Sequence, residues 1–161
     1  MGSLMNNPDS EFEAVWQALA KRDFTKARQL LDEMPADIAA TSEARRAAAR
    51  AAWLQGFPEA TKVILIEATK DHPDDIPLVT DVALLYLDVG HAKTALDILN
   101  EVIKRQPDLK EATIARYGAL VALGRTPEAR KMLKAALDKN LAEGGKVPSW
   151  KPLLSCFTPW I

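Results

Sequence analysis

The stretch DDIPLVTDVALLYLDVGHAKTALDILNEVIKRQP, residues 74–107, contains the pattern that decides the fold. The apolar residues of its first half recur at helical intervals of three, one and three, and they are Val79, Val82, Ala83 and Tyr86. Those of its second half recur at intervals of four and three, and they are Ala95, Leu99 and Val102. Gly90 separates the halves and Pro107 ends the second one. The stretch therefore predicts two amphipathic helices folded back on each other.

The flanking sequence repeats this unit with a fixed period. Gly56, Gly90 and Gly124 lie 34 residues apart, each where one amphipathic segment gives way to the next, and Pro73 and Pro107 have the same separation. Together with the apolar spacing of residues 74–107, this period resembles the tetratricopeptide repeat of 34 residues. The resemblance implies an all-α fold, a right-handed superhelix of about four antiparallel helix pairs.

Four repeat units are expected, at 8–35, 42–73, 74–107 and 108–142. In the first unit, Arg22-Asp23 takes the place of the turn glycine. Residues 35–41 form the longest connection before the C-terminus. The helix-capping residues expected from the sequence are Asp9 or Ser10, Ser42, Asp74 or Asp75, and Asp108. The domain organisation is thus a leader or cloning scar at 1–7, a helical repeat domain at 8–143 and an apolar tail at 144–161.

Composition limits the function classes. A chain of 161 residues fits one domain, and its 21 basic and 22 acidic residues give no net field that favours nucleic acid or an anionic membrane. Cys156 is the only cysteine, which excludes an internal disulfide. Charged residues interrupt every helical segment, so no membrane span is expected. The opening MGSLM is not a signal peptide, which predicts a cytoplasmic protein unless a leader has been removed.

The resemblance also implies a concave groove lined by the first helix of each repeat. The repeat register places on that groove Phe12, Trp16, Arg46, Arg50, Trp53, Thr80, Leu84, Leu87 and Ile114. Apolar anchoring is expected from Trp16, Trp53, Leu84 and Leu87, while Arg46 and Arg50 would select an acidic group. The alternatives are that both tryptophans are core residues and that the arginines form a solvated face paired with Glu43 and other carboxylates.

The C-terminal tail, KVPSWKPLLSCFTPWI, differs from the repeats in composition. Its prolines forbid a continuous helix, and its large apolar side chains favour docking on a protein surface. The expected anchors are Trp150, Leu153, Leu154, Phe157 and Trp160. Three hypotheses remain: the tail caps the last repeat, it fills the protein's own groove, or it binds another subunit or a larger assembly.

No pattern of residues indicates catalysis, a cofactor or a metal ion. His72 and His91 lie in or beside turns without a second histidine at ligand spacing, and phosphate-binding glycine loops and nucleophile motifs are missing from the sequence. The expected function is a non-catalytic scaffold or adapter that binds a peptide or helix of a partner protein. The alternatives are a structural subunit that oligomerises through its tail and end faces, and a chaperone-like holder of a secreted or aggregation-prone client.

Overall fold

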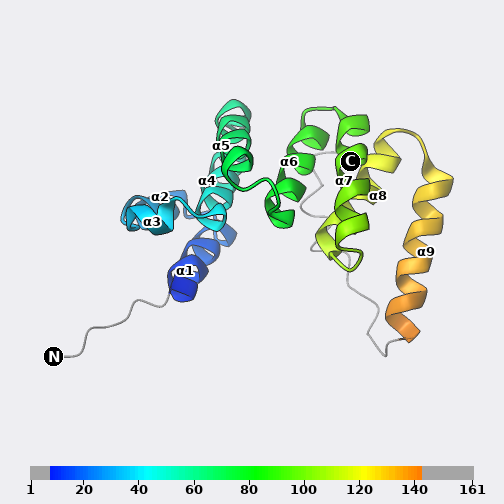
Figure 1. The fold of residues 1–161 in the computed structure, drawn as a ribbon, viewed down its shortest axis with the longest axis horizontal. Coiled ribbons are helices and arrows are strands. Elements are labelled where there is room, and N and C mark those ends of the chain that lie inside the picture. The colour runs from blue at the N-terminus through cyan, green and yellow to red at the C-terminus, as the bar shows by residue number, and fades with distance from the viewer. Residues whose placement is uncertain (1–7, 143–161) are drawn as a thin grey trace. The chain divides into compact units, whose positions relative to one another are not determined.

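The computed structural model describes residues 8–142 of the chain, and in this range every regular element is a helix (Figure 1). The helices are α1 Pro8–Ala20, α2 Phe24–Asp32, α3 Ala36–Ala39, α4 Ser42–Leu54, α5 Pro58–Asp71, α6 Ile76–Asp88, α7 Ala92–Arg105, α8 Lys110–Ala122 and α9 Thr126–Ala142. The all-α expectation and the antiparallel pairing of successive helices are confirmed. The chain divides after Leu85, within α6, into two compact units.

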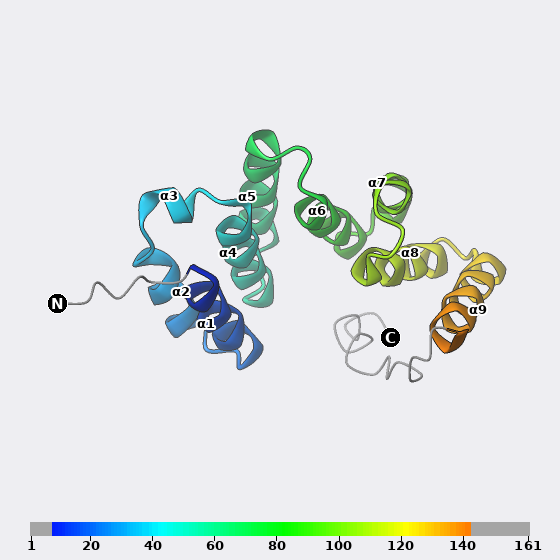
Figure 2. The same ribbon diagram turned by 60° about the horizontal axis from the view of Figure 1, so that its bottom comes forward.

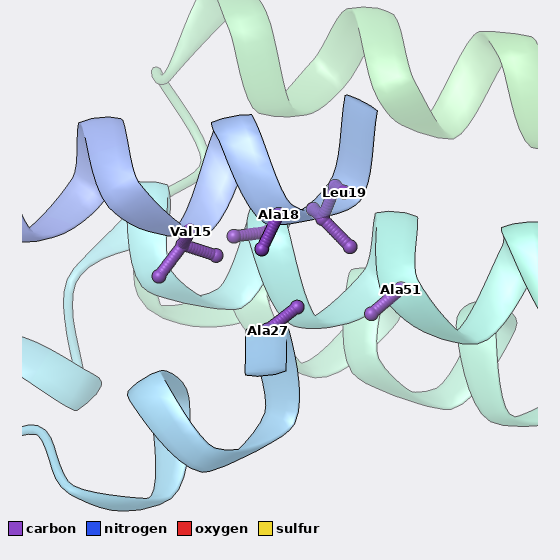
Figure 3. Packing of buried hydrophobic residues seen from close by; sticks show 6 residues of the cluster. Val15, Ala18, Leu19, Ala27 and Ala51 are labelled. Carbon is purple, nitrogen blue, oxygen red and sulfur yellow. The ribbon is translucent and has the colours of Figure 1, made fainter. Parts of the chain in front are cut away.

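In the first unit, α4 is the central helix. It packs against α1, α2, α3 and α5, and Figure 2 shows it between the α1–α2 pair and α5. Such close neighbours are accommodated because the buried side chains of α4 are all alanines, at positions 44, 47, 49 and 51. Figure 3 shows how Val15, Ala18 and Leu19 of α1 meet Ala27 of α2 and Ala51 of α4.

A second cluster in this unit joins α4 and α5 to α6. Its buried members are Ala49, Leu65, Ala68, Leu78 and Leu85. α4 again contributes an alanine, while Leu65, Leu78 and Leu85 come from α5 and α6. The apolar stripe of each helix therefore continues from one helix pair to the next inside this unit.

The second unit packs α7 against α8 and α8 against α9. α7 buries one stripe, formed by Ala92, Ala95, Leu96, Leu99 and Val102. Three of these residues, Ala95, Leu99 and Val102, were predicted from the sequence. α8 meets it with buried alanines at 112, 115 and 119 and with Leu120. Both helices thus bury a mixture of alanines and larger apolar side chains, since α8 also buries Ile114.

The turns between paired helices use the left-handed backbone conformation. Gly56, Gly90 and Gly124 have φ angles of 81°, 85° and 72°, as expected for glycines that end a helix. Arg22, one period before Gly56, has a φ angle of 59° in the same role. The carboxylate of Asp23 compensates at this turn by accepting a hydrogen bond of 3.0 Å from the amide of Lys26.

Several predicted helix starts are wrong in detail. α1 begins at Pro8, before Asp9 and Ser10. Thr41, not Ser42, caps α4, because its hydroxyl accepts a bond of 3.3 Å from the amide of Ala44. α8 begins after Leu109 without a side-chain cap, and Asp108 pairs instead with Lys139 of α9. The connection at 35–41 also contains the short helix α3, which the sequence analysis missed.

Asp75 has two roles at the start of α6. One carboxylate oxygen accepts a bond of 2.8 Å from the amide of Leu78, which is the predicted cap. The other accepts a bond of 2.6 Å from the hydroxyl of Ser42, at the start of α4. The residue expected to cap α4 therefore connects the first turns of two helices.

Within residues 8–142, no helix is long and apolar enough to cross a membrane. The tail anchors Trp150, Leu153, Leu154, Phe157 and Trp160 lie outside the described residues, as does the leader at 1–7.

Candidate partner-binding cleft

A small cleft in the first unit brings together three of the predicted site residues. α4 presents Arg46, Arg50 and Trp53 on one face, since they are spaced by four and three residues. The rest of the lining comes from Ala49 of α4, Thr61 and Leu65 of α5, and Asp81 and Leu85 of α6. The cleft thus has an apolar floor and a charged rim.

Arg46 is held by an ion pair across the cleft. Its Nε lies 2.7 Å from Oδ2 of Asp81, and the two side chains are 25% and 15% exposed. Because the pair is partly buried, separating it would leave a charge poorly solvated. Arg46 therefore links α4 to α6 and is already neutralised.

Arg50 lies over the ring of Trp53, with 5.0 Å between the guanidinium carbon and the ring centroid. This is the geometry of a cation–π contact, which holds the side chain flat on the indole. In the part of the chain that the structure describes, no carboxylate pairs with Arg50. Its planar fork of N–H donors remains available to a carboxylate from outside.

The neighbouring charged residues are engaged elsewhere. Arg45 pairs with Asp71 of α5 at 2.5 Å. Glu43 accepts a bond of 3.4 Å from the indole nitrogen of Trp16. The hypothesis of an arginine face paired with carboxylates thus describes Arg45 and Arg46, though not through Glu43, and it does not describe Arg50.

The other predicted groove residues have different environments. Phe12, Thr80 and Ile114 are buried, at 7%, 2% and 7% exposure, and the hydroxyl of Thr80 donates to the carbonyl oxygen of Ile76. They are core positions, because their side chains face neighbouring helices. Trp16 is half-buried against the core of the first unit. Leu84 and Leu87 are also half-buried.

The sequence analysis missed the part of the cleft that comes from α5 and α6. Leu85, not Leu84, lines it, and Asp81 was not among the predicted site residues. The sequence did contain a signal for the ion pair between α4 and α6. Arg46 and Asp81 are 35 residues apart, one repeat period plus one, so they lie on equivalent helices of adjacent repeats and carry opposite charges.

No group of three or more metal-ligating side chains occurs among residues 8–142. The Nε2 atom of His72 donates to the carbonyl oxygen of Ala40 at 3.1 Å. His91 is exposed, and its ring makes an edge contact with Tyr86 at a centroid distance of 6.3 Å. Both histidines thus have local structural roles in the turns where they lie.

The paired helices, the 34-residue period and the left-handed turns define a tetratricopeptide-repeat fold. Among solved structures, the chain is similar to MamA, a tetratricopeptide-repeat protein. The MamA AMB-1 structure has a TM-score of 0.60 and 21% identity, over 81% of this chain and 77% of that one. The MamA MSR-1 structure has a TM-score of 0.60 and 23% identity, over 81% and 75%. At this identity the likeness shows the fold.

No protein-family model matches the sequence. No curated protein matches it either.

Proposed function

We propose that the protein is a non-catalytic scaffold that holds a peptide or helix of a partner protein in the cleft between α4 and α6. The repeat fold supports this proposal, because stacked helix pairs present continuous surfaces that suit extended partners. An apolar side chain of the partner would lie over the mouth of the cleft, beside Trp53, and a carboxylate would bind at its rim.

Arg50 is the observation that carries the proposal. Its guanidinium is oriented by Trp53 and has no carboxylate partner within residues 8–142, whereas Arg45 and Arg46 each have one. An arginine held in one orientation loses little conformational entropy when it binds, and a bidentate bond to a carboxylate is among the stronger polar contacts. The acidic group expected from the sequence would therefore bind Arg50 alone, while Arg46 stays with Asp81.

The lining of the cleft favours binding over chemistry. It holds two arginines, one aspartate that is already paired, one threonine and four apolar or aromatic side chains. A general base or nucleophile needs a free side chain with a partner that activates it, and this set supplies neither. We infer that specificity comes from one apolar contact and one charge.

A displayed peptide library would test the proposal. Peptides selected on the whole protein should carry an acidic residue next to an apolar one. Replacing Arg50 with Ala should weaken their binding by about tenfold or more, the typical effect of losing a charged hydrogen bond. Replacing Trp53 with Ala should weaken it further, because the apolar contact and the support for Arg50 are lost together.

Arg28 supplies the matched control. It is an exposed arginine of α2, paired with Asp32 at 3.6 Å, and it does not line the cleft, so R28A removes the same charge outside the site. The selected peptides should bind R28A and the unaltered protein equally. Equal binding to R50A and the unaltered protein, with both folded, would refute a role for the cleft.

A further inference from the structure

The second unit exposes three large apolar side chains near one end of its helices. Among its described residues, the large apolar side chains that are exposed are Val89, Val121 and Leu123, at 47%, 44% and 38%. Val89 immediately precedes Gly90, and Leu123 immediately precedes Gly124. All three residues therefore lie at or beside the two turns of this unit.

The two turns lie at the same end. α7 and α8 pack against each other as an antiparallel pair, so the start of α7 and the end of α8 are adjacent. The turn containing Val89 leads into α7, and the turn containing Leu123 follows α8. We call Val89, Val121 and Leu123 the turn patch.

The repeat register shows that the turn patch is particular to this unit. The residue before the left-handed turn position is Lys21 in the first repeat and Gln55 in the second, but Val89 and Leu123 in the third and fourth. A polar residue is thus replaced by an apolar one in the two repeats that precede the tail. Exposing several large apolar groups at one end of a helix pair is unfavourable, and a covering segment would remove them from water.

The chain beyond α9 has the composition and the length to cover the patch. α9 starts at Thr126, beside the patch, and its 17 residues carry the chain about 25 Å away. The 19 residues at 143–161 can span about 60 Å when extended, more than the return needs. From Lys146 onward they contain seven large apolar residues and no acidic residue.

We propose that residues 147–161 of the same chain fold back and bind the turn patch. This chooses between the three hypotheses for the tail: it covers the end of the second unit and leaves the cleft of the first unit free. The cleft, whose unpaired charge is positive, is a poor site for a segment whose only charged side chain is Lys151. The tail of the same chain is favoured over that of a second chain because a short tether keeps its effective concentration high.

The single native cysteine makes the proposal directly testable. A nitroxide label on Cys156 should broaden the amide resonances of Gly90 and Gly124, which lie in the patch turns. The resonance of Gly56, in the equivalent turn of the first unit, should keep its intensity. Diluting the labelled protein into unlabelled, ¹⁵N-enriched protein should give no broadening, since the contact is within one chain.

Paired substitutions separate the turn patch from exposed apolar residues in general. V89Q with L123Q should restore the intensities of Gly90 and Gly124. F57Q with V63Q changes residues of the first unit that are 57% and 54% exposed, and it should leave the broadening as it was. All four positions are exposed, so both variants should fold.

Other patterns would overturn the proposal. Broadening at Gly56, at Trp53 or Arg50, or only in the mixed sample would place the tail elsewhere or on a second chain. Uniformly sharp resonances would mean that the tail does not dock. Labelling S155C in a C156S background would show whether the label itself had displaced the tail, and sharp resonances there as well would reject the proposal.

Discussion

Helix α4 of the first unit and helix α7 of the second bury different kinds of side chain. α4 buries four alanines and packs against α1, α2, α3 and α5, whereas α7 buries a stripe that includes Leu96, Leu99 and Val102 and packs mainly on α8. Small residues let several helices approach one axis, while large ones supply more buried area against fewer neighbours. One repeat period therefore accommodates two kinds of core.

The largest expected effect is on the leucine stripe. Leu99 is fully buried, so L99A removes contacts and leaves a cavity, and we expect a loss of about 3 kcal/mol in the free energy of unfolding. Urea unfolding followed by circular dichroism measures it. V63A, at a position that is 54% exposed, should change the free energy of unfolding by less than about 0.5 kcal/mol. A loss below about 1 kcal/mol in L99A would mean that the helices of the second unit collapse onto the space.

The alanine core should be destabilised by a larger side chain, not by a smaller one. Ala47 is fully buried between helices, so A47L overfills the space and should cost about 2 kcal/mol. A60L, on an exposed position of α5, should be nearly neutral and serves as the control in the same unfolding assay. A neutral A47L would show that α1 and α2 move apart readily, and the contrast between the two cores would then disappear.

The turns provide a finer comparison. A Cβ added at Gly90 meets nothing within 4 Å, so the expected loss of about 1 kcal/mol in G90A comes from backbone strain alone. R22G should be stabilising by up to about 1 kcal/mol, because it relieves that strain in the first repeat. Thermal unfolding of both variants would test the pair. Equal destabilisation by both would indicate that the side chain of Arg22 stabilises its turn.

The smallest effect concerns the position after each left-handed residue. In the first repeat it is Asp23, a cap, and in the fourth it is Arg125, whose guanidinium bonds both oxygens of Glu128 at 2.7 and 2.6 Å. The hydrogen bond from Arg125 lowers the pKa of Glu128 below its ordinary value. The contribution of this pair to stability is therefore present above the pKa of the unfolded chain and is lost as the pH falls through the lower folded value.

A carboxyl NMR titration of Glu128 measures this pKa directly. The midpoint should move back toward the ordinary value for glutamate in R125Q. R130Q, which changes another exposed arginine of α9, should leave the midpoint where it is. An unchanged midpoint in R125Q would mean that the start of α9, not the arginine, lowers the pKa.

Most of the fold could be predicted from the sequence because its signal is periodic. The 34-residue glycine spacing located the turns, and the left-handed Arg22 confirmed the expected replacement of a glycine. Helix starts were harder. Thr41 and Ser42 are equally good caps by composition, and only the Ser42–Asp75 bond decides between them.

The candidate site could be predicted only on the helix that carries its pattern. Arg46, Arg50 and Trp53 share a face of α4, so their spacing sufficed. The burial of Phe12, Thr80 and Ile114 depends on how neighbouring helices pack against each other. The spacing of residues along one helix does not contain that information. Whether an arginine has a carboxylate partner likewise depends on the neighbouring helices. Of three equivalent-looking arginines, only the contacts show that Arg50 is the unpaired one.

Asp75 has a consequence for the order in which the repeats open. Arrays of this kind can fray one helix pair at a time, because each pair touches only its neighbours. One carboxylate that caps α6 and also binds Ser42 couples the first turn of α6 to that of α4. The amides of Ala44 and Leu78 should then exchange with solvent in the same opening event, and D75N should separate their exchange rates. A single side chain would in this way set the size of a cooperative unfolding unit.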